Sequence, residues 1–156
     1  MTDEEYMRLA IGTTREGLSR GQTPFGACIV RDDEIVACAH NHVWAHTDIT
    51  AHAEVEAIRS ACHKLGAIDL SGCTIYSTCE PCPMCFAAIH WARIERIVYG
   101  ATIADAQGAG FHELTISNDT MRELGGSEVV VDGPVLREEC AALFTEWANH
   151  PAKRVY

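Results

Sequence analysis

The sequence predicts a three-layer α/β/α sandwich around a mixed sheet of about five strands, formed by one α/β domain over residues 1–156. Three observations lead to this fold class. Short apolar runs typical of strands alternate with longer segments of helical period. The strands expected near residues 73 and 97 flank one helix, which indicates a right-handed parallel crossover. Finally, 47% apolar residues in a chain of 156 can bury one substantial core.

The first part of the chain is expected to hold a helix, a β-hairpin and a second helix. Asp3 is the expected cap of the first helix. Thr50 is the expected cap of the second helix, and Gly66 ends it. The hairpin turn is expected at residues 32–33. The expected bounds are 4–19 and 52–64 for the helices, 25–30 and 34–40 for the strands, and 41–50 for an irregular loop.

The rest of the chain is expected to alternate strands with helices. Gly100 ends one strand, Pro134 precedes the last helix, and Pro151 would stop that helix. The expected bounds are 73–77, 97–99 and 128–131 for strands, 82–94, 118–124 and 135–148 for helices, 102–110 for a Gly/Ala-rich stretch, and 149–156 for a tail.

Two separate segments offer zinc ligands. One carries His52, and the other carries Cys82 and Cys85 after Pro81. Zinc takes tetrahedral nitrogen and sulfur ligands, and a catalytic zinc site has three protein ligands plus one open position. Residues i and i+3 share a helix face, and the N–H groups of a first helical turn stabilise thiolates. We therefore predict one zinc ion per chain, bound by His52, Cys82 and Cys85.

Glu54 follows His52 by two residues and can reach a zinc-bound water without being a ligand. Zinc lowers the pKa of that water to near neutrality, so a neighbouring carboxylate can carry its proton to a substrate nitrogen and then to a leaving amine. The alternative is a structural zinc site in which Glu54 is a solvated helix residue. The combination of His-x-Glu with Pro-Cys-x-x-Cys is typical of zinc deaminases and favours catalysis.

Composition restricts the partners and the compartment. A formal net charge of −10 disfavours nucleic-acid binding, because phosphate backbones attract Lys and Arg. No apolar run is long enough to span a membrane, and no signal peptide is recognisable, so we expect a cytoplasmic protein without membrane contact. Of the eight cysteines, two are expected as thiolates on the metal and six as small buried side chains.

Several segments together match one protein superfamily. They are Pro24–Ala27, Asn41, Thr50–Ile58, Ser77–Cys85, Ala88–Arg93, Val98–Ala101, Asp105–Ala106 and Ala109–Phe111. On these residues the chain resembles the cytidine-deaminase superfamily, and within it the bacterial zinc-type guanine deaminases and the related plant guanosine deaminases. The resemblance implies a cytidine-deaminase-like fold and hydrolysis of guanine to xanthine and ammonia. A zinc-bound hydroxide would attack C2, with Glu54 as proton shuttle and the Cys82 N–H holding the charged oxygen.

Other functions stay open at this point. The same chemistry could act on guanosine or another amino-heterocycle. The tRNA adenosine deaminases share the zinc motifs, but they usually have Leu in place of Cys79 and differ over residues 104–111. A zinc-stabilised binding protein with a decayed catalytic site is a further alternative, which the intact Glu54 disfavours.

The resemblance also implies which residues contact a purine. Phe25 and Trp91 are the candidates for stacking, although each could equally be a core residue. Asn41 can both donate and accept along the edge of the base, and Ala53 is a further expected contact. Glu113 is expected to accept from ring N–H groups or to move protons. It lies in a His-Glu pair where the superfamily typically has Asp-Asp.

The C-terminal segment is expected to complete the site of a homodimer. Members of the superfamily associate around the zinc helices. In the bacterial guanine deaminases the C-terminal segment crosses to the partner and ends close to an aromatic residue. The resemblance therefore implies that residues 135–156 are exchanged between subunits and that Tyr156 lies over the partner's purine pocket. The alternative is a disordered terminus.

Overall fold

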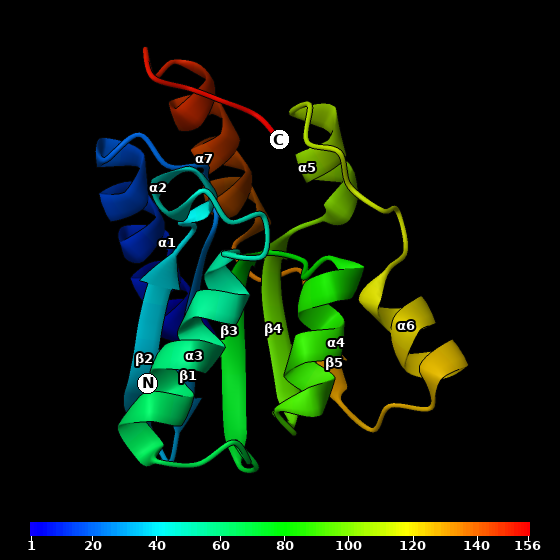
Figure 1. Ribbon diagram of the computed structural model, residues 1–156. Helices are drawn as coiled ribbons and strands as arrows, with labels where there is room; N and C mark the ends of the chain where they lie inside the picture. The colour runs from blue at the N-terminus through cyan, green and yellow to red at the C-terminus, as the bar shows by residue number, and fades with distance from the viewer.

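The computed structural model describes residues 1–156. It contains one mixed β-sheet with helices on both faces (Figure 1). The strands are β1 (Gly26–Arg31), β2 (Glu34–His40), β3 (Cys73–Cys79), β4 (Arg96–Ala101) and β5 (Val130–Asp132). Their order is β2-β1-β3-β4-β5. β1 is antiparallel to β2 and β3, whereas β3, β4 and β5 are parallel. The predicted three-layer sandwich with a mixed sheet is confirmed.

Helices cover the two faces of the sheet. They are α1 (Asp3–Ser19), α2 (Val43–His46), α3 (Ala53–Leu65), α4 (Pro83–Trp91), α5 (Ile103–Gly108), α6 (Asn118–Gly125) and α7 (Arg137–Ala148). α3 and α4 lie side by side on the face toward the viewer in Figure 1, and α1 and α7 lie behind the sheet. None of these helices combines the length and the apolar character needed to cross a bilayer.

The central strands are apolar on both sides because each side packs against helices. Ile75 and Ile97 belong to the core under α3 and α4, whereas Tyr76 and Val98 belong to the core under α1 and α7. Successive side chains of a strand point to opposite faces, so adjacent residues of one strand supply the two cores. This two-sided burial holds β3 and β4 rigidly, and the loops that follow them carry the candidate site.

The cap of α1 differs from the prediction by one residue. Thr2, not Asp3, is the N-cap: its hydroxyl accepts from the Glu5 N–H, and the Glu5 carboxylate accepts from the Thr2 N–H. The Asp3 carboxylate instead accepts hydrogen bonds from the Arg96 guanidinium at 2.7 and 2.9 Å. A long-range ion pair therefore determines the role of Asp3, and no local pattern signals it.

The cap of α3 is also different from the prediction. His52 is the N-cap in extended conformation, and Thr50 is not a cap. The Thr50 N–H and hydroxyl both donate to the Asp48 carboxylate, which forms a tight turn in the loop before the helix. That loop also contains the one-turn helix α2 where an irregular segment was expected.

Two further boundaries were missed. The Gly/Ala-rich stretch contains α5, which Thr102 caps through a reciprocal pair of hydrogen bonds with Asp105. α4 ends at Trp91 rather than at residue 94. The end of the helix coincides with Arg93 in the left-handed region at φ 59°.

The β1–β2 hairpin contains a disulfide that the sequence analysis did not predict. Asp32 and Asp33 both have positive φ and form the predicted turn, which alone would place Cys28 opposite residue 37. A bulge after Ile29 shifts the pairing by one residue, so Cys28 lies opposite Cys38 and the two form a disulfide. Six small buried thiols were expected besides the two candidate ligands, and four of these six are free.

Candidate active site

Three candidate ligands meet where α3 and α4 begin, beside the carboxyl end of β3. His52 and Cys82 are the N-cap residues of the two helices, and Cys85 lies in the first turn of α4 after Pro83. The His52 Nδ1 atom is 3.5 Å from the Cys85 Sγ and 3.7 Å from the Cys82 Sγ. All three ligand atoms lie within 4.8 Å of one another. The structure thus brings the predicted metal ligands together.

The spacing of these atoms suits a tetrahedral zinc ion. With zinc–nitrogen and zinc–sulfur distances of about 2.0 and 2.3 Å, neighbouring ligand atoms are about 3.5 to 3.8 Å apart. One of the two thiols also ionises readily, which favours binding of a cation. A hydrogen bond from Cys85 lowers the pKa of the Cys82 thiol to about 4, and His52 contributes in the same direction. Cys85 correspondingly holds the shared proton, and its pKa is well above the ordinary value.

Glu54 lies beside the ligands and is 6% exposed. Its Oε1 accepts from the Ser77 hydroxyl at 3.1 Å, and its Oε2 accepts from the Cys85 thiol at 3.4 Å. Burial is the largest cause that raises the pKa of Glu54, followed by the negative charge of Cys82. A carboxyl group held in this way can take up and release a proton next to the metal site.

Glu113 supplies a second carboxyl group beside the ligand cluster. It follows α5 in the chain and, together with Phe25 and Glu54, lines a small inner cavity next to the ligands. Burial raises the pKa of Glu113 to about 7, and the charges of Cys82 and Glu54 add to the effect. The structure thus brings Glu113 to the site where the sequence predicts it, with its pKa raised in the metal-free protein.

This raised pKa predicts a stability difference in the metal-free protein. The pKa of Glu113 is about 7 when folded and 4.5 ordinarily, so its stabilising contribution is complete below pH 4.5 and is lost as pH rises through 7. Glu113→Gln has no such loss. The melting temperature of the variant minus that of wild type, both measured with chelator, is expected to rise between pH 4.5 and 7. A difference that stays constant with pH would contradict this assignment.

The inner cavity opens into a larger, mostly apolar one of about 260 Å³. His52, Cys82, Glu113 and Tyr156 line both cavities. The wall of the larger cavity also contains Ile49, Pro83, Met84, Phe111, His112 and Leu114. A flat heterocycle entering through the larger cavity would therefore meet the ligand cluster and Glu113 together.

Phe25, Asn41 and Ala53 are all near the ligand cluster. The Phe25 ring stands edge-on to Phe111 with centroids 4.9 Å apart and lines the inner cavity. Asn41 is fully buried, and its Oδ1 accepts from the Val43 N–H at 3.0 Å. Ala53 is buried between His52 and Glu54 at the start of α3. The positions of these side chains are compatible with the predicted substrate contacts.

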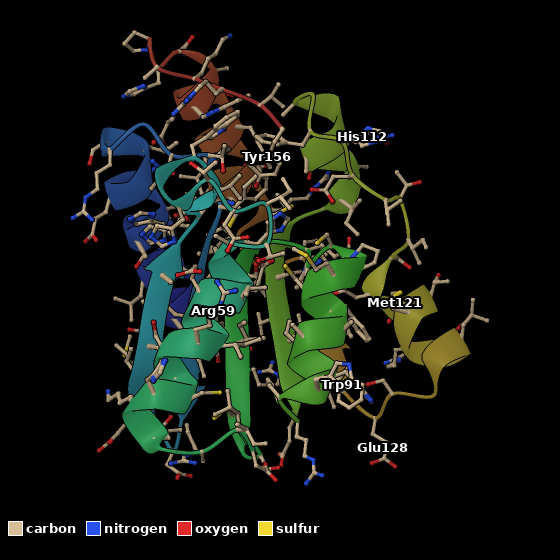
Figure 2. All side chains as sticks on the ribbon, viewed as in Figure 1. Arg59, Trp91, His112, Met121, Glu128 and Tyr156 are labelled. Carbon is tan, nitrogen blue, oxygen red and sulfur yellow. A yellow bond between two sulfur atoms is a disulfide. The ribbon has the colours of Figure 1, made fainter.

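Trp91 is not part of this site, which corrects the stacking prediction. Its side chain is 83% exposed at the far end of α4 (Figure 2). Nine residues of helical chain separate it from Cys82, or about 13 Å along the axis. Closeness in sequence to the metal ligands therefore does not bring Trp91 to the site of its own chain.

The C-terminal tail covers the site of its own chain. The Asn41 Nδ2 donates to the Tyr156 hydroxyl at 2.7 Å, and the Tyr156 ring centroid is 5.6 Å from that of His52. The Trp44 indole N–H donates to the Arg154 carbonyl at 3.3 Å, while the Arg154 guanidinium lies 4.3 Å from the centre of the Trp44 ring. Tyr156 was predicted to lie over the partner's pocket, whereas within this single chain it lies over the cavity of its own chain. Trp44 was not predicted as an anchor of the tail.

Two other residues around the site, Ser77 and Glu80, were also not predicted. Ser77 follows Ile75 by two residues on β3 and so faces α3, a signal that could have identified it. The Glu80 carboxylate accepts from the N–H groups of Ile103 and Asn118. The sequence contains no signal for these contacts, because they join segments that are distant along the chain.

Comparisons with known proteins agree with this geometry. Residues 1–101 match the family model of the cytidine and deoxycytidylate deaminase zinc-binding region. The chain is 40% identical over 157 residues to the guanine deaminase of Bacillus subtilis (strain 168), with 100% of both chains covered. It is 36% identical over 152 residues to the tRNA-specific adenosine deaminase of the same organism, with 97% of this chain and 92% of that protein covered.

A solved structure extends the comparison to a bound ligand. The crystal structure of a mutant protein in complex with 8-azaguanine is 28% identical to this chain, with a TM-score of 0.86. It covers 93% of this chain, and 83% of that protein is covered. The similarity thus includes a protein that binds a purine analogue.

Proposed function

This chain belongs to the cytidine and deoxycytidylate deaminase zinc-binding family, and we propose that it hydrolyses guanine to xanthine and ammonia. The protein is accordingly a zinc-dependent aminohydrolase. The observation that carries the proposal is the buried Glu54 carboxyl beside the cluster of His52, Cys82 and Cys85. The full-length similarity to a guanine deaminase and the fold shared with an 8-azaguanine complex support guanine as the substrate.

Each group at the metal site has a separate role in this reaction. His52, Cys82 and Cys85 would hold the ion, which when bound acts as a Lewis acid and makes water acidic near neutral pH. Glu54 accepts one proton from the attacking water and delivers it to the ring nitrogen beside C2. It then takes the remaining proton of the new hydroxyl group and gives it to the amine, so that the C2–N bond breaks, ammonia leaves and the oxygen becomes a carbonyl. The Cys82 N–H donates to the oxygen that bonds to C2 as negative charge develops there.

The surrounding side chains hold the base. Phe25 packs against the purine ring, and Ala53 contacts it at the start of α3. The Asn41 amide pairs with the edge of the base and with Tyr156. Glu113 accepts from ring N–H groups and can exchange protons with the base.

A tRNA substrate is less compatible with this chain. The related tRNA-specific adenosine deaminase shows that the same family acts on RNA. The net charge of −10 here opposes binding to a phosphate backbone. The tail also covers the site through Tyr156, which leaves a small cavity of about 260 Å³ as the way in. Guanosine is the second candidate, because the same chemistry applies to its base.

The experiment is ammonia release from guanine, guanosine, adenine, cytosine, cytidine and tRNA. Guanine is expected to be turned over best, and tRNA not at all. A preference for adenosine in a tRNA anticodon would refute the guanine proposal. A large preference for guanosine over guanine would keep the reaction but change the substrate to the nucleoside.

We further propose that the protein is a cytoplasmic homodimer with exchanged C-terminal segments. Three apolar side chains around the cavity are exposed and could be covered by a partner: Ile49, Met84 and Leu114. The tail contacts through Asn41 and Trp44 can form equally well between two chains, because residues 135–156 would only have to cross over. Six of the eight cysteines are free, which supports a reducing compartment, whereas the Cys28–Cys38 disulfide counts against it.

Removal of Tyr156 tests the tail. Deleting Val155 and Tyr156 is expected to lower kcat/KM for guanine about tenfold or more, since the pocket loses one covering contact. Zinc content and dimer mass should not change. Unchanged kinetics in the truncated protein would show that the tail has no role in the reaction.

Mixing two impaired dimers distinguishes exchange from self-coverage. One carries Glu54→Gln, and the other lacks Val155 and Tyr156. If segments are exchanged, each mixed dimer regains one complete site, so an equal mixture recovers about a quarter of the wild-type sites after subunit exchange. If each tail covers its own chain, no complete site forms and the activity stays at the average of the two parents.

A further inference from the structure

Asn118 is a fully buried polar residue that contacts the metal loop, residues 80–82 between β3 and α4. It is the first residue of α6, and its side-chain Nδ2 donates to the Pro81 carbonyl at 2.6 Å. Its Oδ1 is buried without a hydrogen-bond partner. Buried amides are normally paired at both ends, so a half-paired one calls for an explanation. The one bond that Asn118 makes ends on the residue before the candidate ligand Cys82.

The Pro81 carbonyl and the Cys82 N–H belong to one peptide group. A peptide group is planar, so a bond that fixes the direction of its C=O also fixes the direction of its N–H. The Cys82 N–H has no acceptor within the protein. The hydrogen bond from Asn118 to the Pro81 carbonyl also polarises the Pro81–Cys82 peptide group, which makes the Cys82 N–H a stronger donor. Asn118 can therefore aim and strengthen the donor that serves the reacting oxygen.

The amide of Asn118 is itself held in place. Its backbone N–H donates to the Glu80 Oε1 at 2.9 Å, and the Glu80 Oε2 accepts from the Ile103 N–H at 3.3 Å. Ser117 caps α6 by accepting from the Thr120 N–H, which keeps the first turn of the helix formed. Glu80 thus connects the metal loop to the beginnings of α5 and α6.

From these contacts we propose that Asn118 is a positioning residue for the reaction, acting through the Pro81–Cys82 peptide. It touches neither substrate nor metal. The side chain orients the Cys82 N–H toward the oxygen that develops charge on the substrate. The kinetic part of this inference rests on the proposed deaminase function, whereas the orientation of the peptide does not.

Selective labelling observes this peptide directly. Pro81–Cys82 is the one Pro–Cys bond in the sequence, so ¹³C-carbonyl proline with ¹⁵N-cysteine gives a single carbonyl–amide correlation in NMR. In Asn118→Ala the carbonyl signal is expected to move to lower frequency, because it loses its hydrogen bond. Asp119→Ala removes an exposed side chain on the same helical turn, which pairs only with Arg122, and leaves the cap and Asn118 in place. It therefore serves as the matched control and should leave that signal unchanged.

Kinetics test the effect on catalysis. In Asn118→Ala at full zinc content, kcat for guanine is expected to fall about tenfold with KM within about twofold, because the N–H acts on the transition state. Asp119→Ala should keep kcat within about twofold of wild type. An unchanged carbonyl signal or an unchanged kcat in Asn118→Ala would overturn the proposal, and so would an equal loss of kcat in Asp119→Ala.

A second variant covers the case in which Asn118→Ala does not fold. Asn118→Asp keeps the shape, and its carboxyl can donate to Pro81 only while it is protonated. Its kcat relative to wild type is expected to fall as pH rises, and a ratio that does not depend on pH would overturn the proposal. If wild type releases no ammonia from any substrate in the panel, the proposed function fails, while the NMR comparison still decides the orientation of the peptide.

Discussion

Replacing Glu54 with glutamine is expected to lower kcat for guanine about a thousandfold or more, because the variant cannot carry a proton. Glutamine has nearly the same shape, so the hydrogen bond from Ser77 and the packing of α3 should remain. Zinc content and melting temperature should therefore stay close to wild type. The measurements are steady-state ammonia release, elemental analysis and thermal unfolding on the same preparation.

Glu56→Gln is the matched control for this variant. Glu56 lies on the same helix two residues later and pairs with Arg59 instead of facing the site. Its replacement should leave kcat within about twofold of wild type, since a partly exposed ion pair within one helix contributes little to stability and does not reach the ligands. Turnover in Glu54→Gln comparable to that in Glu56→Gln would remove Glu54 from the mechanism.

The second large effect is expected from the double variant Cys82→Ala/Cys85→Ala. It removes both sulfur ligands and leaves His52 as a single nitrogen ligand, which cannot hold zinc against dialysis. Elemental analysis should find one zinc ion per wild-type chain and less than about a tenth of an ion per chain in the variant. Ammonia release should fall below detection, because the attacking water then keeps its ordinary acidity.

Cys62→Ala provides the control for the loss of a thiol. Cys62 is a free, partly buried cysteine on α3 that is not part of the ligand cluster. This variant should keep its zinc and its activity. Full metal retention in the double variant, or loss of zinc in Cys62→Ala, would show that the ion is held elsewhere.

The predictable part of the fold is the part that local pattern determines. The β1–β2 turn, the return strand and the Gly66 end of α3 were all predicted, because each depends on residues close in sequence. α5 was missed, since a Gly/Ala-rich composition concealed its capping residues. The disulfide was missed because a one-residue bulge, which has no clear sequence signal, decides which cysteines face each other.

The candidate site shows the same division. Spacing was sufficient to identify His52, Cys82, Cys85 and Glu54, because the chemistry of zinc restricts which residues can serve. Trp91 shows the limit of such reasoning, since closeness in sequence placed it at the wrong end of α4. Asn118 could not be found at all, because its bond to Pro81 exists only after α6 has packed against the metal loop.

The bulge in the β1–β2 hairpin has a consequence for the pocket at the opposite end of the strands. The Asn41 N–H donates to the Phe25 carbonyl at 3.0 Å, so the hairpin places two of the predicted substrate contacts side by side at its open end. The distance from turn to pocket is about 20 Å at the usual rise per strand residue. Without the bulge, the pairing set by the turn would place Phe25 opposite His40 instead of Asn41. A one-residue irregularity within the hairpin therefore decides which side chains meet at the distant pocket.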